Sequence, residues 1–233
     1  MKVGRGTSFL FSAVGFFFSC ITPSASGGQP AQIYYMKKKK IPIPVSTQVL
    51  LIVTITYKLV LVLLGLGIAI FGQKFIHTYI DDVQWVFYLG LVLNVVCVAG
   101  MVLFAFHPSL AKAFVVKGSR LLEKMRFLRH KKSREEKLAA SMEKYNQTAD
   151  YMMGHFGMLV VVFIITVVQR FSLFAATWFV YKAFGLAGAS AGLIILMQGA
   201  IAVAVDMLPL PGGMGISEKL FMEMFLPIFG STL

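Results

Sequence analysis

Three long apolar stretches constrain this chain more than any other feature of its sequence. They cover residues 45–72, 84–106 and 156–181, and each is long enough for a helix that crosses a bilayer, which needs about 20 apolar residues. Hydrophobic residues make up 58% of the chain and charged residues only 14%, whereas about a quarter of an ordinary soluble domain is charged. This composition argues against a water-soluble enzyme and against a disordered chain. It predicts an all-α, polytopic membrane protein.

The remaining apolar sequence is divided into shorter segments. Residues 186–208 are rich in Gly and Ala and are predicted as a fourth span. Residues 7–36 and 209–230 contain apolar runs too short to cross and return, so we expect re-entrant or partial helices there. The first run is alternatively the end of a spanning helix whose start is missing. We therefore expect one integral membrane domain over residues 1–233, with a basic loop at 107–155.

The basic residues predict the orientation. The net charge is +12, and half of the 22 Lys and Arg lie within residues 107–155, while four more occupy residues 37–40. Basic clusters that border apolar stretches are typical of cytoplasmic loops, so both are predicted to be cytoplasmic and residues 73–83 external. The same distribution argues against a direct nucleic-acid partner. The 107–155 stretch has weak helical periodicity and is expected to lie against anionic headgroups.

Two breaks rich in Pro and Gly resemble each other. The first reads ITPSASGGQP over residues 21–30, and the second reads MLPLPGGMGISE over residues 207–218. Pro removes an amide donor and Gly permits positive φ, so each break is expected to unwind a helix and expose backbone groups beside a helix N-terminus. Transporters built from repeats use such broken helices to bind charged substrates. Alternatively, each break is a structural turn at the membrane surface.

The breaks and the charged residues inside apolar stretches supply the candidate lipid-binding residues. The cations are expected to bind a lipid phosphate and the acids a cationic headgroup, or else the charges pair internally, as Lys58 or Arg170 with Asp206 would. An acid in the first turn after Ser217 also stabilises a helix N-terminus. The candidates are Thr22, Pro23, Ser26, Gly27, Gly28, Gln29, Lys58, Arg170, Asp206, Pro211, Gly212, Gly213, Gly215 and Glu218.

Other reactive residues show no pattern that indicates chemistry. The four histidines have no metal-ligand or catalytic spacing, and Cys20 and Cys97 lie in separate apolar runs. No phosphate-binding loop or Ser–His–Asp grouping is present. The sequence therefore predicts no catalytic residue, no metal and no cofactor.

The order of the two breaks carries a family resemblance. The run ITPSASGGQPAQIYYMKKKKIPIP, the long apolar stretch after it, the basic connector and the closing LPLPGGMGISEKLF resemble the lysylphosphatidylglycerol synthase transmembrane region. This family of flippase-like membrane proteins is also known as the phosphatidylglycerol lysyltransferase family. Its best-known members join a membrane flippase region to a cytosolic domain that transfers lysine from lysyl-tRNA to phosphatidylglycerol. The product lowers the negative charge of the cell surface and protects against cationic peptides.

The resemblance implies a multi-pass protein of the cell membrane that handles an (aminoacyl-)phospholipid and contributes to resistance to cationic peptides. Two alternatives stay open: the membrane part of a phosphatidylglycerol lysyltransferase, and a small-solute transporter. The chain has no long soluble stretch for the transferase domain, and it is shorter at both ends than family members usually are. The expected partners are membrane phospholipids, with a separate soluble aminoacyl-transfer domain or protein as a further candidate.

Overall fold

The described part of the chain is built from helices. The computed structural model describes residues 3–22, 26–106, 132–208 and 214–229. Every regular element within these ranges is helical, which confirms the predicted all-α class. Three helical segments are long and apolar enough to cross a membrane, and they coincide with the three long apolar stretches. They are α3 (Ile43–Phe71), the segment Asp81–Ala105, which contains most of α5 (Gln84–Phe106), and α8 (Phe156–Ala183).

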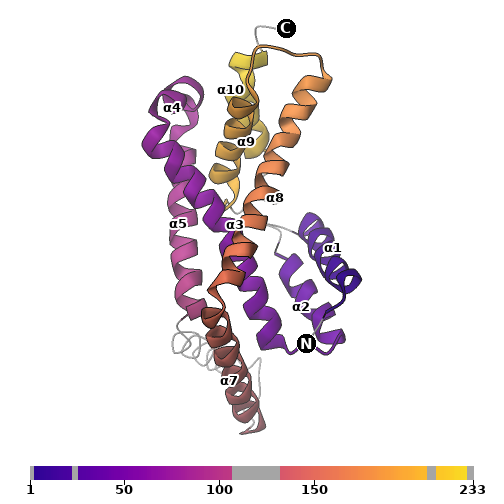
Figure 1. The fold of residues 1–233 in the computed structure, drawn as a ribbon. Helices are drawn as coiled ribbons and strands as arrows, with labels where there is room; N and C mark the ends of the chain where they lie inside the picture. Colours follow the sequence, from indigo (N-terminus) through magenta and orange to yellow (C-terminus); the bar gives the residue numbers. More distant parts are fainter. Residues whose placement is uncertain (1–2, 23–25, 107–131, 209–213, 230–233) are drawn as a thin grey trace.

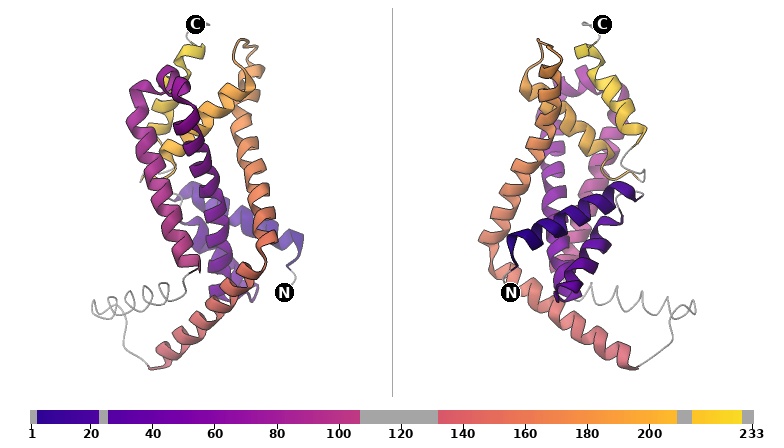
Figure 2. Two further views of the ribbon diagram at one scale, coloured as in Figure 1. Left: turned by 60° about the vertical axis from the view of Figure 1, so that its left-hand side comes forward. Right: turned by 90° about the vertical axis from the view of Figure 1, so that its right-hand side faces the viewer.

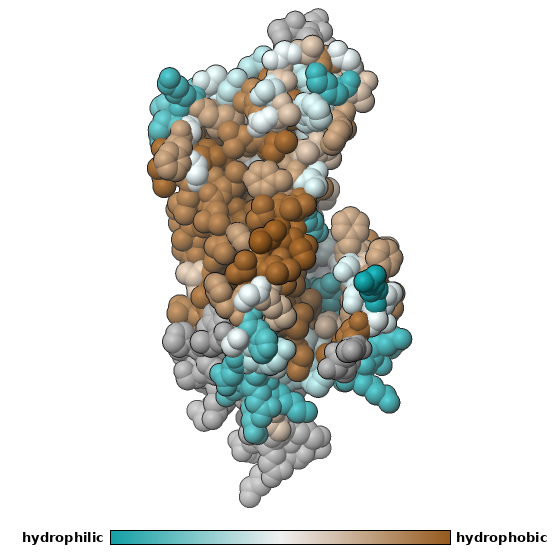
Figure 3. All heavy atoms as spheres, viewed as in Figure 1, coloured by the Kyte–Doolittle hydropathy of each residue, from teal (hydrophilic) through white to brown (hydrophobic). Residues whose placement is uncertain are grey.

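These three helices set the two ends of the molecule (Figure 1). The connector between α3 and α5, formed by α4 (Gln73–Tyr79) and the short helix η2 (Asp81–Val83), lies at one end. Helix α7 (Lys132–Gly154) lies at the other, so we call these the α4 end and the α7 end. Figure 3 shows apolar side chains gathered in the middle of the molecule and polar ones toward both ends. This distribution suits a protein whose middle lies in the hydrocarbon of a bilayer.

Two helical hairpins complete the fold and come from opposite ends. Helices α1 (Arg5–Ile21) and α2 (Gly28–Lys38) pack against each other and rise from the α7 end. Helices α9 (Ala191–Val205) and α10 (Ile216–Phe229) also pack together, but they descend from the α4 end (Figure 2). That the two hairpins are re-entrant in a membrane stays a prediction.

Helix α9 is shorter than the span predicted for residues 186–208. Gly185 and Gly188 have φ of 72° and 113°, a left-handed conformation that glycine adopts without steric cost and that breaks a helix. The helix begins only after Ser190, whose Oγ accepts a hydrogen bond from the Leu193 amide at 3.2 Å. The 15 residues of α9 extend about 22 Å, which is less than the roughly 30 Å of hydrocarbon in a bilayer.

The main hydrophobic core surrounds α9. This helix packs against α3, α5 and α8, and its residues Ile194, Met197 and Val203 are fully buried. Gly90 of α5 allows the closest approach, because a Cβ there would lie 2.5 Å from the carbonyl oxygens of Val203 and Ala204. By contrast, the α1–α2 hairpin has only a small cluster of its own, formed by Phe11, Met36 and Ile41.

Part of the basic stretch at 107–155 is helical, since it contains α7. The hydroxyl of Tyr145 on α7 donates a hydrogen bond of 2.8 Å to the Phe104 carbonyl. Ala149 and Met152 are buried farther along the same helix. Helix α7 therefore packs against the ends of the spanning helices. Residues 107–131 lie outside the described part of the chain.

Candidate functional site

An ion pair joins the middle of α3 to the end of α9. Lys58 Nζ lies 2.5 Å from Asp206 Oδ2, and only 12% of each side chain is exposed. Asp206 is the C-cap residue of α9, where the negative end of the helix dipole disfavours a carboxylate. Lys58 offsets this repulsion, and its amine also lies 2.8 Å from Met207 Sδ. The structure thus contains the internal Lys58–Asp206 pair, which the sequence offered as one of two alternatives.

Tyr57 connects this pair to the third charged residue. Its hydroxyl donates a hydrogen bond to the other carboxylate oxygen of Asp206. The guanidinium of Arg170, from the middle of α8, stacks on the Tyr57 ring with Cζ 3.8 Å from the ring centroid. Such cation–π stacking orients a guanidinium without neutralising its charge. Tyr57 therefore places Arg170 beside the ion pair.

Arg170 differs from Lys58 in having no acidic partner among the described residues. Its Nε is buried, and no hydrogen-bond acceptor for it occurs in the described ranges. The central cluster, which we define as Tyr57, Lys58, Arg170 and Asp206, consequently carries one net positive charge. A cation at the centre of a membrane costs about 2.5–3.5 kcal/mol on insertion scales, so this cluster favours an anion.

The first hairpin contacts the same region of α3. Gln29 Nε2 donates a hydrogen bond of 2.8 Å to Thr54 Oγ1. Thr54 precedes Lys58 by four residues, so the two lie on one face of α3 about 6 Å apart along its axis. Both hairpins therefore converge on neighbouring turns of one helix: the first through Gln29, and the second through Asp206.

The glycines of the first break act through close packing. The expectation of positive φ is wrong for the first Gly pair, since Gly27 has φ of −80° and Gly28 is not among the positive-φ glycines. Instead, a Cβ on Gly28 would lie 2.1 Å from Ser19 Oγ and 2.7 Å from the Gly15 carbonyl oxygen. The absence of side chains lets α1 and α2 cross closely, as small residues do in membrane helices.

Thr22 closes the turn between these two helices. Its Oγ1 accepts a hydrogen bond of 2.9 Å from the Gly27 amide and donates one of 2.5 Å to the Phe18 carbonyl. Ser26 also lies in this turn. Pro23 lies outside the described residues. The role of these residues in binding lipid stays a prediction.

Glu218 caps a helix at the second break. Its Oε2 accepts hydrogen bonds from the Gly215 amide at 2.6 Å and from Ser217 Oγ at 2.8 Å. Gly215 has φ of 87° and stands at the N-cap position of α10, so Glu218 satisfies an amide that the helix leaves free. These contacts provide the structural explanation that the sequence offered for Glu218. Pro211, Gly212 and Gly213 lie outside the described residues, so the approach of the two breaks to each other stays a prediction.

Two residues of this region were missed by the sequence analysis. Tyr57 and Thr54 look like ordinary members of an apolar span, because Tyr and Thr are common packing residues. The position of Tyr57 next to the intramembrane Lys58 was the available signal.

The comparisons with known proteins agree with the motifs. The family described as "Lysylphosphatidylglycerol synthase TM region" matches residues 1–232. Neither the curated proteins nor the solved structures gave a match to this chain. Because the family match extends over nearly the whole sequence and three apolar helices support a membrane location, the chain belongs to the lysylphosphatidylglycerol synthase transmembrane family.

Proposed function

We propose that this protein moves an anionic or aminoacylated phospholipid across the cell membrane through the central cluster, and so contributes to resistance to cationic peptides. One observation carries the proposal. Arg170 holds a charged guanidinium near the middle of a spanning helix, with a buried Nε that has no partner among the described residues. A phosphate suits this group because its oxygens accept hydrogen bonds from the planar guanidinium.

The neighbouring ion pair gives the proposed site a second specificity. When an aminoacyl headgroup brings its own ammonium, this group competes with Lys58 for the Asp206 carboxylate. The phosphate and the ammonium of one lipid then contact Arg170 and Asp206, while Tyr57 keeps both protein groups in place. A headgroup without the ammonium leaves the Lys58–Asp206 pair intact, so the two lipids differ in how they rearrange the cluster.

The hairpins supply the proposed route. One comes from each end of the molecule, and both contact α3 beside the cluster. Rocking of one hairpin against the spanning helices would open the cluster toward one membrane face at a time, as in transporters with inverted repeats. A separate soluble aminoacyl-transfer domain or protein is a proposed partner, which would deliver lipid at the α7 end.

Reconstituted vesicles test the proposal. Fluorescent phosphatidylglycerol and lysylphosphatidylglycerol, with headgroups accessible to a quencher on one side only, report movement between leaflets. Arg170→Gln should lower the rate at least tenfold, since one buried charge-assisted contact is worth about 1.5–3 kcal/mol. Lys182→Gln, at an exposed position near the end of the same helix, should keep the wild-type rate.

Three results would contradict the proposal. The first is a wild-type rate for folded Arg170→Gln. The second is the absence of lipid movement by the wild-type protein, together with uptake of a soluble cation or amino acid, which would favour the small-solute transporter. The third is lysine transfer to phosphatidylglycerol without lipid movement when a soluble transferase is added, which would favour the lysyltransferase role.

A further inference from the structure

A second basic site lies far from the central cluster, at the α7 end. A pocket of about 410 Å³ opens there between the end of α2, the start of α3 and helix α7. Three lysines line it, Lys37, Lys40 and Lys144, together with the apolar residues 41–44. We call it the lysine pocket. Along α3 it is about 22 Å from Lys58, at 1.5 Å of rise per residue.

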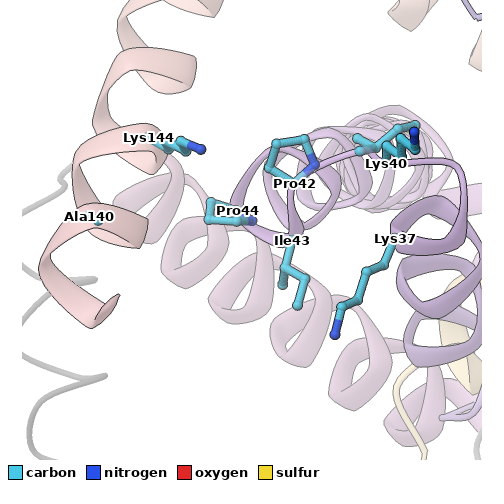
Figure 4. Close-up of a pocket in the computed structure, with 8 residues that line it drawn as sticks. Lys37, Lys40, Pro42, Ile43, Pro44, Ala140 and Lys144 are labelled. Carbon is cyan, nitrogen blue, oxygen red and sulfur yellow. The ribbon is translucent and has the colours of Figure 1, made fainter. Parts of the chain in front are cut away.

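The three amines come from two parts of the chain, the four-lysine run 37–40 and helix α7. Lys37 lies in the last turn of α2, Lys40 in the loop before α3, and Lys144 on α7. Figure 4 shows Lys144 on one side of Pro42 and Pro44, with Lys37 and Lys40 on the other. No ion pair joins any of the three to an acidic side chain in the described ranges. The fold thus gathers three lysines that form no ion pair with a described acidic side chain around an apolar surface.

The backbone at Lys40 supports a role for its side chain. Lys40 has φ of 63°, and it is the one residue other than glycine with positive φ in the described part of the chain. This left-handed conformation favours glycine, because the Cβ of any other residue meets steric resistance there. The chain therefore presents a lysine where the backbone geometry alone would favour glycine.

We propose that the lysine pocket binds the headgroup of an anionic phospholipid, which holds α7 against α2 and the start of α3. The three amines surround the pocket and attract the headgroup phosphate, and the apolar residues 41–44 contact the adjoining glycerol and upper acyl chain. The positive end of the α3 dipole adds to the attraction. The membrane is the source of this anion, because the pocket is at the beginning of a spanning helix.

This site is independent of lipid movement through the central cluster. It would bind a resident lipid whether or not the protein moves lipids. The four-lysine run offers a matched test, because Lys37 and Lys40 line the pocket whereas Lys38 and Lys39 do not. Lys38 instead lies over the ring of Tyr34, at 4.9 Å from its centroid.

The test uses the full chain in nanodiscs of phosphatidylcholine with or without phosphatidylglycerol. Native mass spectrometry measures the retained phosphatidylglycerol, and a thermal scan measures unfolding. Lys37→Gln/Lys40→Gln should retain phosphatidylglycerol at least roughly tenfold less well than wild type, since each lysine near an anionic headgroup contributes roughly fivefold. Lys38→Gln/Lys39→Gln, which removes the same charge from the same run, should retain it nearly as well as wild type.

Thermal unfolding gives a second test, in which the variant with weaker lipid retention should be at least as stable as the wild type when no anionic lipid is present. In pure phosphatidylcholine, Lys37→Gln/Lys40→Gln should unfold at the wild-type temperature or above, because it relieves repulsion among the lysines. Phosphatidylglycerol should then stabilise the wild type more than this variant. Should the double variant fail to fold, Lys144→Gln removes the pocket charge from α7 instead, with an expected loss of roughly fivefold in retention.

Three outcomes would overturn the inference. Equal losses of phosphatidylglycerol retention in the two double variants would show that the lipid is attracted to the whole basic run and not to the pocket. Equal retention of phosphatidylglycerol and phosphatidylcholine by the wild type would show that no anionic headgroup is recognised. Complete displacement of phosphatidylglycerol by inorganic phosphate would make the pocket a site for a soluble anion.

Discussion

The two hairpins resemble each other in sequence but differ in how the protein holds them. Helix α9 is surrounded by α3, α5 and α8, and many of its side chains are fully buried. The α1–α2 hairpin instead exposes Phe9, Phe16 and Phe17 and contacts the rest of the protein mainly along α3. Helix α9 of the second hairpin is thus held inside the core, whereas the first hairpin is attached at the edge of the protein.

This difference gives the two hairpins different roles in the protein. Asp206 is held in a fixed position by the core, so it can set the geometry of the central cluster. Gln29 is carried by a hairpin whose residues lie outside that core. We therefore expect the second hairpin to determine stability and the first to determine access to the cluster.

The largest expected effect comes from Gly90, where α5 meets the second hairpin. Gly90→Ala places a Cβ 2.5 Å from two carbonyl oxygens of α9, so the helices must separate, and we expect a loss of about 3 kcal/mol or more in unfolding free energy. Gly100→Ala on the same helix is the control, because a Cβ there meets no atom within 4 Å. Equal stability of the two variants in detergent would mean that α9 does not pack as closely as the structure indicates.

Breaking the ion pair of the second hairpin should cost slightly less. Asp206→Asn leaves Lys58 without its acid, and removal of one partner of a buried pair costs about 3 kcal/mol. The double variant Lys58→Met/Asp206→Leu removes both charges and should regain most of that loss. Lys219→Gln breaks the Lys219–Glu223 pair of α10, 3.6 Å long, on the side of its exposed lysine, and should change stability by less than about 1 kcal/mol. A double variant as unstable as Asp206→Asn would show that the loss of stability does not come from leaving Lys58 unpaired.

Gly28 tests whether the first hairpin is independent of the core. Gly28→Val brings a side chain against Ser19 and the Gly15 carbonyl, which should cost about 1–3 kcal/mol of hairpin packing. Hydrogen exchange should rise in α1 and α2, while the global unfolding temperature changes far less than with Gly90→Ala. Gly6→Val, in open surroundings on α1, is the matched control. A global loss as large as that of Gly90→Ala would remove the distinction between the hairpins.

The smallest expected effect concerns the bond between the first hairpin and α3. Gln29→Leu or Thr54→Val removes a hydrogen bond of 2.8 Å worth about 1 kcal/mol. A double-mutant cycle should give a coupling energy of that size, with faster hydrogen exchange in α2. Additive effects, with no coupling, would show that Gln29 does not attach the hairpin through Thr54.

The spanning helices could be predicted from the sequence, because an apolar stretch of about 20 residues or more has few alternatives to a helix that crosses the membrane. Lys58, Arg170 and Asp206 could also be singled out, since a charge inside a membrane is costly and seldom occurs without a partner. The residues that contact these charges could not be predicted. Pairing across helices depends on how each helix is rotated about its axis and on the angle at which two helices cross, and one sequence specifies neither. Tyr57 was missed for this reason, and the role of Gly28 was misassigned, since close packing and positive φ both favour glycine.

We expect the two hairpins to enter the membrane from opposite faces, and labelling of single cysteines tests this arrangement most directly. In a background of Cys20→Ala and Cys97→Ala, a cysteine replaces Lys39, just after α2, or Ala187, just before α9; both positions are exposed. An impermeant thiol reagent applied to intact cells should label the Ala187→Cys variant at once. It should label Lys39→Cys only after the membrane is permeabilised. Labelling of both variants from the same side, in folded protein, would contradict the account.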